Sequence, residues 1–291
     1  MQEKICIIYI IGAGRSGTTL LDIILGNTPE IFSAGELNRF VKRKGIPHDA
    51  RDIEAEQFWA GVRQNLEKEN MADFETLYNI SKKIEYHGSV FNLFRTNTSN
   101  PWFAKYISFQ KALFKNILKQ AIRYNKTIIC DSSKYPMRGL LLSKIFGRKI
   151  SFIYIKRNPH TVVDSFQKKD IEQPPKSRIT ANIYLLAVNA IANKVIKRVK
   201  KENKVAIINY DDLIRDPTST LDTIEKGLNI NLQQAKNLIN TNQPLQVGLL
   251  FDGNRLRLKN QITFNKKIQG NKNKKLIDSL FYPLHKLIWY K

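Results

Sequence analysis

The chain has 291 residues, of which 42% are hydrophobic, and this length suffices to bury the core of one α/β domain with a helical insertion. Its formal net charge of +23 indicates anionic ligands, such as a nucleotide with several phosphates, an acidic acceptor or a membrane surface. Because the lysines are spread along the chain and no recognisable nucleic-acid-binding motif occurs, nucleic acid is not expected as the main partner.

The cysteines and the hydrophobic segments bear on cellular location. Cys6 and Cys130 are the only cysteines, and both lie in predicted strands, which suits reduced core thiols better than a disulfide framework or metal site. No signal segment precedes the first predicted strand, and no apolar run approaches the roughly 18 residues of a membrane span. These features predict a cytoplasmic protein without a transmembrane segment.

The first predicted elements are a buried strand, a tight turn and a helix start. The strand is the β-branched run from Ile5 to Ile11, and helical apolar spacing begins after Gly17. The free N–H groups of the first helical turn then point into the intervening loop, which is suited to bind phosphate. The residues expected to form this anion-binding loop are Gly12, Gly14, Arg15, Ser16, Gly17, Thr18 and Thr19.

The loop departs from the ATP-binding pattern G-x-x-x-x-G-K-[ST]. Gly12 and Gly17 have the correct spacing, but Thr18 occupies the lysine position and the cation has moved to Arg15. Such a loop, with two threonines opening the helix, resembles the 5′-phosphosulfate loop of sulfotransferases that use 3′-phosphoadenosine 5′-phosphosulfate (PAPS). The alternatives are a P-loop kinase and a strand-turn-helix corner with incidental glycines.

After the first helix, a short extended segment from Ile31 to Leu37 returns the chain to this loop. It carries Glu36, and a carboxylate beside a bound anion is unfavourable unless it has a task such as general-base catalysis. Most loop glutamates are simply solvated. The loop, followed by Pro29 and then by Gly35 and Glu36, resembles the start of the Golgi tyrosylprotein sulfotransferases and similar bacterial enzymes. This resemblance implies that Glu36 deprotonates the acceptor hydroxyl and that Arg15 contacts the donor.

Residues 40 to about 125 are predicted to form a helical insertion over the sheet. Helical apolar spacing occurs over 53–68, 74–84 and 106–124. In the family resembled, such insertions carry acceptor specificity. The aromatic residues of the insertion either line an acceptor pocket or belong to the core: Trp59, Trp102, Phe103 and Tyr106.

A second buried strand over 127–131 ends in Asp131. In ATP-dependent kinases of this fold, an aspartate at the end of a buried strand often binds magnesium. Asp131 is therefore the best evidence for the kinase alternative. The sulfotransferase resemblance instead implies roles for Ser133 and Lys134 at the nucleotide. A cation there stabilises the charge that develops on the leaving phosphate.

A third strand over 150–155 is followed by Arg157, and Asn158 and Pro159 suit the start of a helix. This order places Arg157 at the carboxyl edge of the sheet, where ligands bind in open α/β folds. Arg157 with Ser165 eight residues later resembles the 3′-phosphate site of PAPS enzymes. His160 is interpreted as an ordinary helix-start residue.

The remaining chain predicts a long amphipathic helix over 179–200, a strand over 205–210, and short helices over 218–228 and 232–239. The segment from Gly253 to Lys259 resembles a segment that folds over the nucleotide in bacterial sulfotransferases, which implies donor contacts by Asn254, Arg255 and Arg257. In an extended loop both arginines would point the same way, although a solvated basic loop is equally expected. An amphipathic helix over 276–290 suits core packing better than peripheral contact with a membrane.

Together these features predict a single domain over 1–291 with a P-loop α/β fold, namely a mainly parallel sheet of four or five strands, helices on both faces and the insertion. The expected activity is transfer of a sulfuryl group from PAPS to an acceptor hydroxyl or, less favoured, an amine, without a metal. The acceptor is open among peptide tyrosine, saccharide, glycolipid and small metabolite. The alternatives are a small-molecule or nucleotide kinase with magnesium at Asp131, and an anion- or nucleic-acid-binding module with a vestigial loop.

Overall fold

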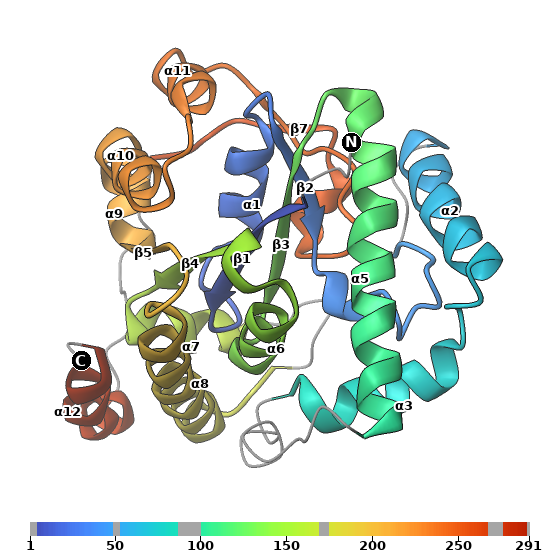
Figure 1. Cartoon of the computed structure of the whole chain (residues 1–291). Helices are drawn as coiled ribbons and strands as arrows, with labels where there is room; N and C mark the ends of the chain where they lie inside the picture. Colours follow the sequence, from blue (N-terminus) through green and yellow to red (C-terminus); the bar gives the residue numbers. More distant parts are fainter. Residues whose placement is uncertain (1–4, 49–52, 87–99, 169–174, 267–275, 290–291) are drawn as a thin grey trace.

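The computed structural model describes residues 5–48, 53–86, 100–168, 175–266 and 276–289. Its centre is a five-stranded sheet of parallel strands in the order β2-β3-β1-β4-β5 (Figure 1). The strands are β1 (Cys6–Gly12), β2 (Ile31–Gly35), β3 (Ile128–Lys134), β4 (Ile150–Lys156) and β5 (Val205–Asn209). The predicted α/β fold with a parallel sheet of four or five strands is therefore confirmed.

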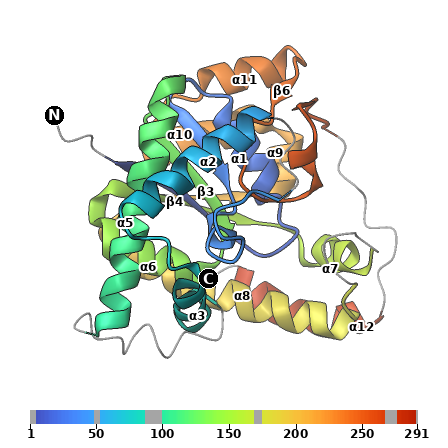
Figure 2. The ribbon, with the colours of Figure 1, turned by 90° about the vertical axis from the view of Figure 1, so that its right-hand side faces the viewer.

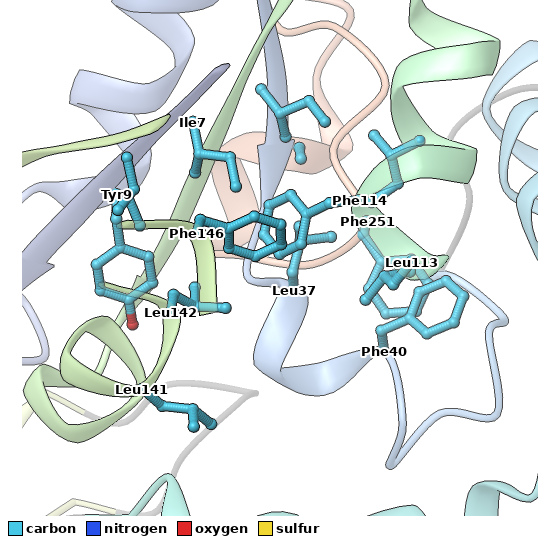
Figure 3. Packing of buried hydrophobic residues seen from close by; sticks show 14 of the residues in the cluster. Ile7, Tyr9, Leu37, Phe40, Leu113, Phe114, Leu141, Leu142, Phe146 and Phe251 are labelled. Carbon is cyan, nitrogen blue, oxygen red and sulfur yellow. The ribbon is translucent and has the colours of Figure 1, made fainter. Parts of the chain in front are cut away.

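The central strand β1 contributes to two hydrophobic cores because successive side chains of a strand point to opposite faces. Ile7, Tyr9 and Ile11 enter one core with the helices α5 (Pro101–Ala121) and α6 (Pro136–Phe146). Figure 3 shows Ile7 and Tyr9 in this core together with side chains of α5 and α6. Ile8 and Ile10 enter the other core with α1 (Thr18–Gly26) and α10 (Pro217–Leu228).

The helical insertion contains α2 (Ile53–Lys68), α3 (Phe74–Ile84) and α5, followed by the 3₁₀ turn η3 (Ile122–Tyr124), and lies on one side of the sheet (Figure 1). The third predicted helix begins earlier than expected, at Pro101 rather than Tyr106. Asn100 caps it by accepting a hydrogen bond from the backbone N–H of Trp102 at 3.2 Å, and proline is favoured in the first turn. Residues 95–99, the rest of the polar stretch before this cap, lie outside the described residues.

The aromatic residues of the insertion belong to the core. Trp59, Phe103 and Tyr106 are buried, and Trp102 packs against the same cluster. The indole N–H of Trp59 donates to the carbonyl of Leu249 at 2.7 Å. Of the two interpretations, the core assignment is therefore confirmed and the acceptor pocket is not, because these rings pack in the core cluster between the insertion and the sheet.

The second half of the chain completes both faces of the sheet and adds a small antiparallel pair. Its elements are the 3₁₀ turn η4 (Gly147–Lys149), α7 (Pro159–Gln167), α8 (Arg178–Val199), α9 (Tyr210–Arg215), α10, α11 (Gln233–Asn240), β6 (Leu245–Gln246), the 3₁₀ turn η5 (Arg255–Leu258), β7 (Gln261–Ile262) and α12 (Leu276–Trp289). Helices α7 and α8 pack on each other, and α12 packs along α8 (Figure 2). Both free cysteines lie in strands of the main sheet, Cys6 in β1 and Cys130 in β3.

Within the described residues, one helix is long and apolar enough to cross a membrane by length and composition alone, namely α8. No uninterrupted apolar run in the sequence has this length, because asparagines and basic residues interrupt α8, but its mean hydropathy over 18 residues is still high. Core helices meet the same criterion, and α8 packs against α6, α7 and α12.

Candidate active site

The loop between β1 and α1 has the backbone of an anion-binding loop. Arg15 and Gly17 have positive φ angles of 67° and 89°. At Gly17 a Cβ would lie 2.2 Å from the ring of Tyr210, so only glycine fits there. No side chain caps α1, whereas Asn158 caps α7 and Ser177 caps α8. The first turn of α1 therefore offers N–H groups and the positive end of the helix dipole to an anion.

A cavity of about 1220 Å³ opens beside this loop, which is ample for a nucleotide and an acceptor group. The expected site residues that line it are Gly14, Arg15, Gly17, Thr18, Thr19, Glu36, Lys134, Arg157, Ser165, Asn254, Arg255 and Arg257. Three others, Gly12, Ser16 and Ser133, do not line it. The basic residues of the lining outnumber its carboxylates, which include Glu36, Asp211 and Asp252, so the cavity suits a polyanion.

Glu36 and Lys134 form an ion pair in this cavity. They meet because β2 and β3 are parallel neighbours in the sheet. Glu36 directly follows β2 and Lys134 is the last residue of β3, so both lie at the same edge of the sheet. Lys134 has a positive φ of 64°, which is uncommon for a residue with a side chain and directs it toward the site. The other oxygen of Glu36 lies 3.8 Å from Nε of Arg39, in the 3₁₀ turn η1 (Leu37–Arg39). Glu36 is thus held between two cations.

Ser133 does not contact the cavity, in contrast to the role implied by its position. Its hydroxyl is hydrogen-bonded to Asp131 and accepts the backbone N–H of Asn38 at 2.9 Å. Asp131 is fully buried, and its second oxygen accepts from Nη2 of Arg138 at 3.0 Å. Because Asp131 is committed to these partners, it is not placed to hold magnesium in the cavity. Ser133 instead supports the turn that leads into Lys134.

Asp131 and Arg138 belong to a buried network that joins the sheet to the insertion. The guanidinium of Arg138 also pairs with Glu85, at the end of α3, and Glu85 accepts the hydroxyl of Tyr106 at 2.7 Å. Burial by itself would lower the pKa of Arg138, but the carboxylates of Glu85 and Asp131 raise it above its ordinary value. The network fixes the insertion beside the turn that bears Lys134.

Arg157 presents an incompletely satisfied guanidinium to the cavity. It stacks on the ring of Tyr210 with 4.2 Å between its Cζ and the ring centroid, and Nη1 donates to the carbonyl of Arg15 at 2.7 Å. Its Nε is buried without a hydrogen-bond partner among the described residues. Burial lowers the pKa of Arg157. An anion in the cavity would supply the missing partner.

Two tyrosines position the loop and were not identified from the sequence as site residues. The hydroxyl of Tyr184, on α8, accepts the N–H of Gly14 at 3.1 Å, so this loop amide is already engaged. Tyr210 packs against both Gly17 and Arg157. Tyr184 stands in a helix far along the chain from the loop, and no local pattern signals that contact. Tyr210 was predicted as the last residue of the strand over 205–210, and its place at the carboxyl end of that strand was the one available signal; in the structure β5 ends at Asn209 and Tyr210 begins α9.

The segment after β6 reaches the loop, but its two arginines differ. Arg255 is exposed at the cavity, whereas Arg257 is buried and donates to the carbonyl of Gly253 at 2.7 Å. The expectation that both point the same way from an extended loop was wrong, because η5 is a 3₁₀ turn and residues two apart in it diverge. Asn254 donates its backbone N–H to Oγ1 of Thr19 at 3.3 Å.

Gly35 allows this segment to approach Glu36. A Cβ at Gly35 would lie 2.3 Å from the carbonyl oxygen of Asp252, and the backbone N–H of Glu36 donates to that same oxygen at 3.0 Å. The carboxylate of Asp252 pairs with Nε of Arg43 at 2.7 Å. The segment around Asp252 therefore holds the backbone of Glu36 in place.

A buried carboxylate below the loop holds the same region from the other side. Asp22 of α1 accepts hydrogen bonds from the hydroxyls of Ser33 and Ser132, each at 2.6 Å, and from the N–H of Gly35 at 3.0 Å. Burial raises the pKa of Asp22 to about 6, although these hydrogen bonds oppose the rise. Asp22 is therefore largely ionised at neutral pH, at a cost in folding free energy.

We expect the contribution of Asp22 to stability to depend on pH. Its folded pKa exceeds the unfolded value of about 3.9, so the folded state binds the proton more tightly, and this stabilisation is lost as the pH rises through about 6. The free energy of unfolding of the wild type, relative to that of Asp22→Asn, should rise by roughly 1 kcal/mol from about pH 7 to about pH 5. Urea denaturation at both pH values measures it, and a difference independent of pH would contradict the assignment.

The fold and the cavity define an α/β protein with a phosphate-type loop whose cation is an arginine. A model described as "Sulfotransferase family" matches residues 8–234, and the chain belongs to this family. The match confirms the resemblance noted in the sequence.

Two solved structures are similar over nearly the whole chain. One is the sulfotransferase domain from the curacin biosynthetic pathway, with a TM-score of 0.55 and 17% identity over 99% of this chain and 98% of that domain. The other is the sulfotransferase domain from the Synechococcus PCC 7002 olefin synthase, with a TM-score of 0.52 and 19% identity over 100% of this chain and 98% of that domain. At these identities the likeness concerns the fold. Among curated proteins, no relative matches the sequence.

Proposed function

We propose that this protein is a PAPS-dependent sulfotransferase that acts on an acceptor hydroxyl. The acceptor oxygen forms a bond to sulfur, the bond between sulfur and the 5′-phosphate oxygen breaks, and the products are a sulfate ester and 3′,5′-adenosine bisphosphate. Glu36 takes the proton of the hydroxyl. The candidate molecules that carry this hydroxyl are a peptide tyrosine, a saccharide, a glycolipid and a small metabolite.

The observation that carries this proposal is the ion pair of Glu36 and Lys134 in the cavity of the anion-binding loop. A carboxylate among so many cations fits a reaction that needs a base next to an anionic donor. Donor charge competes with Glu36 for Lys134, so binding of the donor would free Glu36 to accept a proton. Lys134 and Arg15 then stabilise the negative charge that accumulates on the leaving phosphate.

Arg157 and Ser165 are assigned to the 3′-phosphate of the donor. Both line the cavity, and the buried Nε of Arg157 has no partner within the described residues. A phosphate at this place would accept from a guanidinium already oriented by Tyr210. ATP has no 3′-phosphate, so this assignment separates the two donor classes.

Calorimetric titration tests the donor. We expect 3′,5′-adenosine bisphosphate to bind in the presence of a chelator and to bind more tightly than ATP with magnesium, because the cavity supplies its cations from side chains. A preference for ATP with magnesium, abolished by the chelator, would make the protein a kinase and overturn the proposal.

The same titration tests the 3′-phosphate site. Arg157→Ala should weaken binding of 3′,5′-adenosine bisphosphate by roughly 10- to 100-fold, because a charge-assisted hydrogen bond is lost. Binding of AMP, which lacks the 3′-phosphate, should change far less. The matched control is Arg215→Ala, which removes an exposed arginine whose ion-pair partner among the described residues is Asp212, at 3.4 Å. If Arg157→Ala weakened the binding of both nucleotides equally, Arg157 would not be the residue that contacts the 3′-phosphate.

A further inference from the structure

The C-terminal helix α12 exposes a row of leucines while it buries two polar side chains. Leu280, Leu284 and Leu287 are 74%, 51% and 59% exposed, while Asp278 and His285 are 2% and 3% exposed. The leucines lie at i, i+4 and i+7, so they form one stripe along the outer face of the helix. We call these three residues the leucine stripe. Scattered exposed leucines need no explanation, but an aligned stripe on a helix whose inner face buries an aspartate and a histidine does.

The inner face of α12 is fixed to the domain by polar contacts. A ring nitrogen of His285 is hydrogen-bonded to Oδ1 of Asn182 at 2.8 Å, and Nδ2 of Asn182 donates to Asp278 at 3.2 Å. Arg178 pairs with Asp278, and Nδ2 of Asn193 donates to the carbonyl of Ile288 at 2.6 Å. Because both ends of α12 are tied to α8, the helix cannot simply rotate to bury its leucines. The exposure of the stripe is therefore built into the fold.

Helix α12 and the two helices it packs against carry more cations than acids. The helices α7, α8 and α12 together contain two acidic residues, Asp164 and Asp278, and Arg178 pairs with both. The remaining cations of these helices are Lys194, Lys197, Arg198 and Lys286. In the sequence, residues 266–291 carry seven lysines and a single acid. The matched family region ends at residue 234, so this helix lies beyond it.

We propose that α12 docks the protein on an anionic lipid surface, with the leucine stripe in the interface and Lys286 of the same helix among the basic residues that meet the headgroups. An amphipathic helix with basic flanks binds in this way through apolar burial together with attraction to anionic lipid. Tyr282, stacked on His160 with 5.1 Å between ring centroids, gives the helix an aromatic residue of the kind found at membrane interfaces.

A second copy of the chain is the competing occupant, and charge and area argue against it. Each copy carries a formal charge of +23, so two copies repel each other. A stable interface buries about 800 Å² on each partner, which three partly exposed leucines do not approach. An anionic surface turns the same charge into attraction.

Flotation of the full chain with lipid vesicles tests the proposal. We expect the wild type to float with vesicles of phosphatidylcholine and phosphatidylglycerol but not with phosphatidylcholine alone, and added salt should weaken the binding. The triple variant Leu280→Gln, Leu284→Gln, Leu287→Gln should lower the partition coefficient by roughly 10- to 100-fold. The matched control is Ile46→Gln, Ile53→Gln, Ile207→Gln, which removes three isoleucines exposed elsewhere.

Three outcomes would overturn the proposal. They are absence of wild-type binding to the anionic vesicles, equal binding by the leucine and isoleucine variants, and a wild-type dimer in sedimentation that becomes monomeric in the leucine variant. The last would assign the stripe to a second copy. Titration with 3′,5′-adenosine bisphosphate should give the same affinity in all three proteins, which shows that the variants are folded. It also separates failure of lipid docking from failure of the proposed donor.

Discussion

Glu36→Gln is expected to lower kcat by about 10²- to 10⁴-fold, the range for loss of a general base. Glutamine has nearly the shape of glutamate and still accepts a hydrogen bond from Lys134, but it cannot take a proton from the acceptor. Binding of 3′,5′-adenosine bisphosphate should persist, because the anion-binding loop and Arg157 are untouched. The loss should therefore be confined to the chemical step.

The measurement is release of 3′,5′-adenosine bisphosphate from PAPS, with whichever acceptor gives turnover from a panel of phenols, saccharides and tyrosine peptides. Glu54→Gln is the control, because Glu54 is an exposed glutamate on α2. If Glu36→Gln turned over at the wild-type rate, Glu36 would not be the general base. Loss of nucleotide binding in the same variant would show instead that Glu36 shapes the donor site.

Arg138→Met is expected to lower the free energy of unfolding by about 3–5 kcal/mol, the range for breaking a buried ion pair by removing one partner. Arg138 is fully buried between Glu85 and Asp131. Without Arg138 both carboxylates are buried in a low-dielectric environment without a cation, where the charged form is unfavourable. Burial already raises the pKa of Glu85. The melting temperature should fall by roughly 6–20 °C.

Thermal and urea denaturation measure this loss. Arg63→Met is the matched control, since the ion pair of Arg63 with Glu67 is exposed and contributes about 0–1 kcal/mol. If both variants lost the same stability, the network of Glu85, Arg138 and Asp131 would not hold the insertion to the sheet. A double variant of Arg138→Met with Glu85→Met should be less destabilised than Arg138→Met alone if the unpaired Glu85 carboxylate is the cause.

Much of the fold could be predicted because its signals are local. The strand over 5–11 carries a continuous β-branched run, and the helices over 53–68 and 74–84 carry apolar residues at helical spacing, so these elements needed no partner to be identified. The start of α5 was misplaced by five residues because the cap at Asn100 and Pro101 was read as part of a loop. The turn at Arg255 was misjudged because no local pattern distinguishes an extended loop from a 3₁₀ turn there.

The sequence by itself determined the anion-binding loop, the residue types of the site and the family, because spacing along one strand-turn-helix unit is a local property. Only the tertiary structure decided which side chains meet. Glu36 reaches Lys134 because β2 pairs with β3, and Tyr184 reaches Gly14 because α8 packs beside the loop. Asp131 does not line the cavity because it pairs with Arg138 of α6, and Ser133 does not because its hydroxyl is hydrogen-bonded to Asp131. Likewise, the outward leucines of α12 follow from polar anchors on α8, since periodicity shows that a helix has two faces but not which face the neighbour takes.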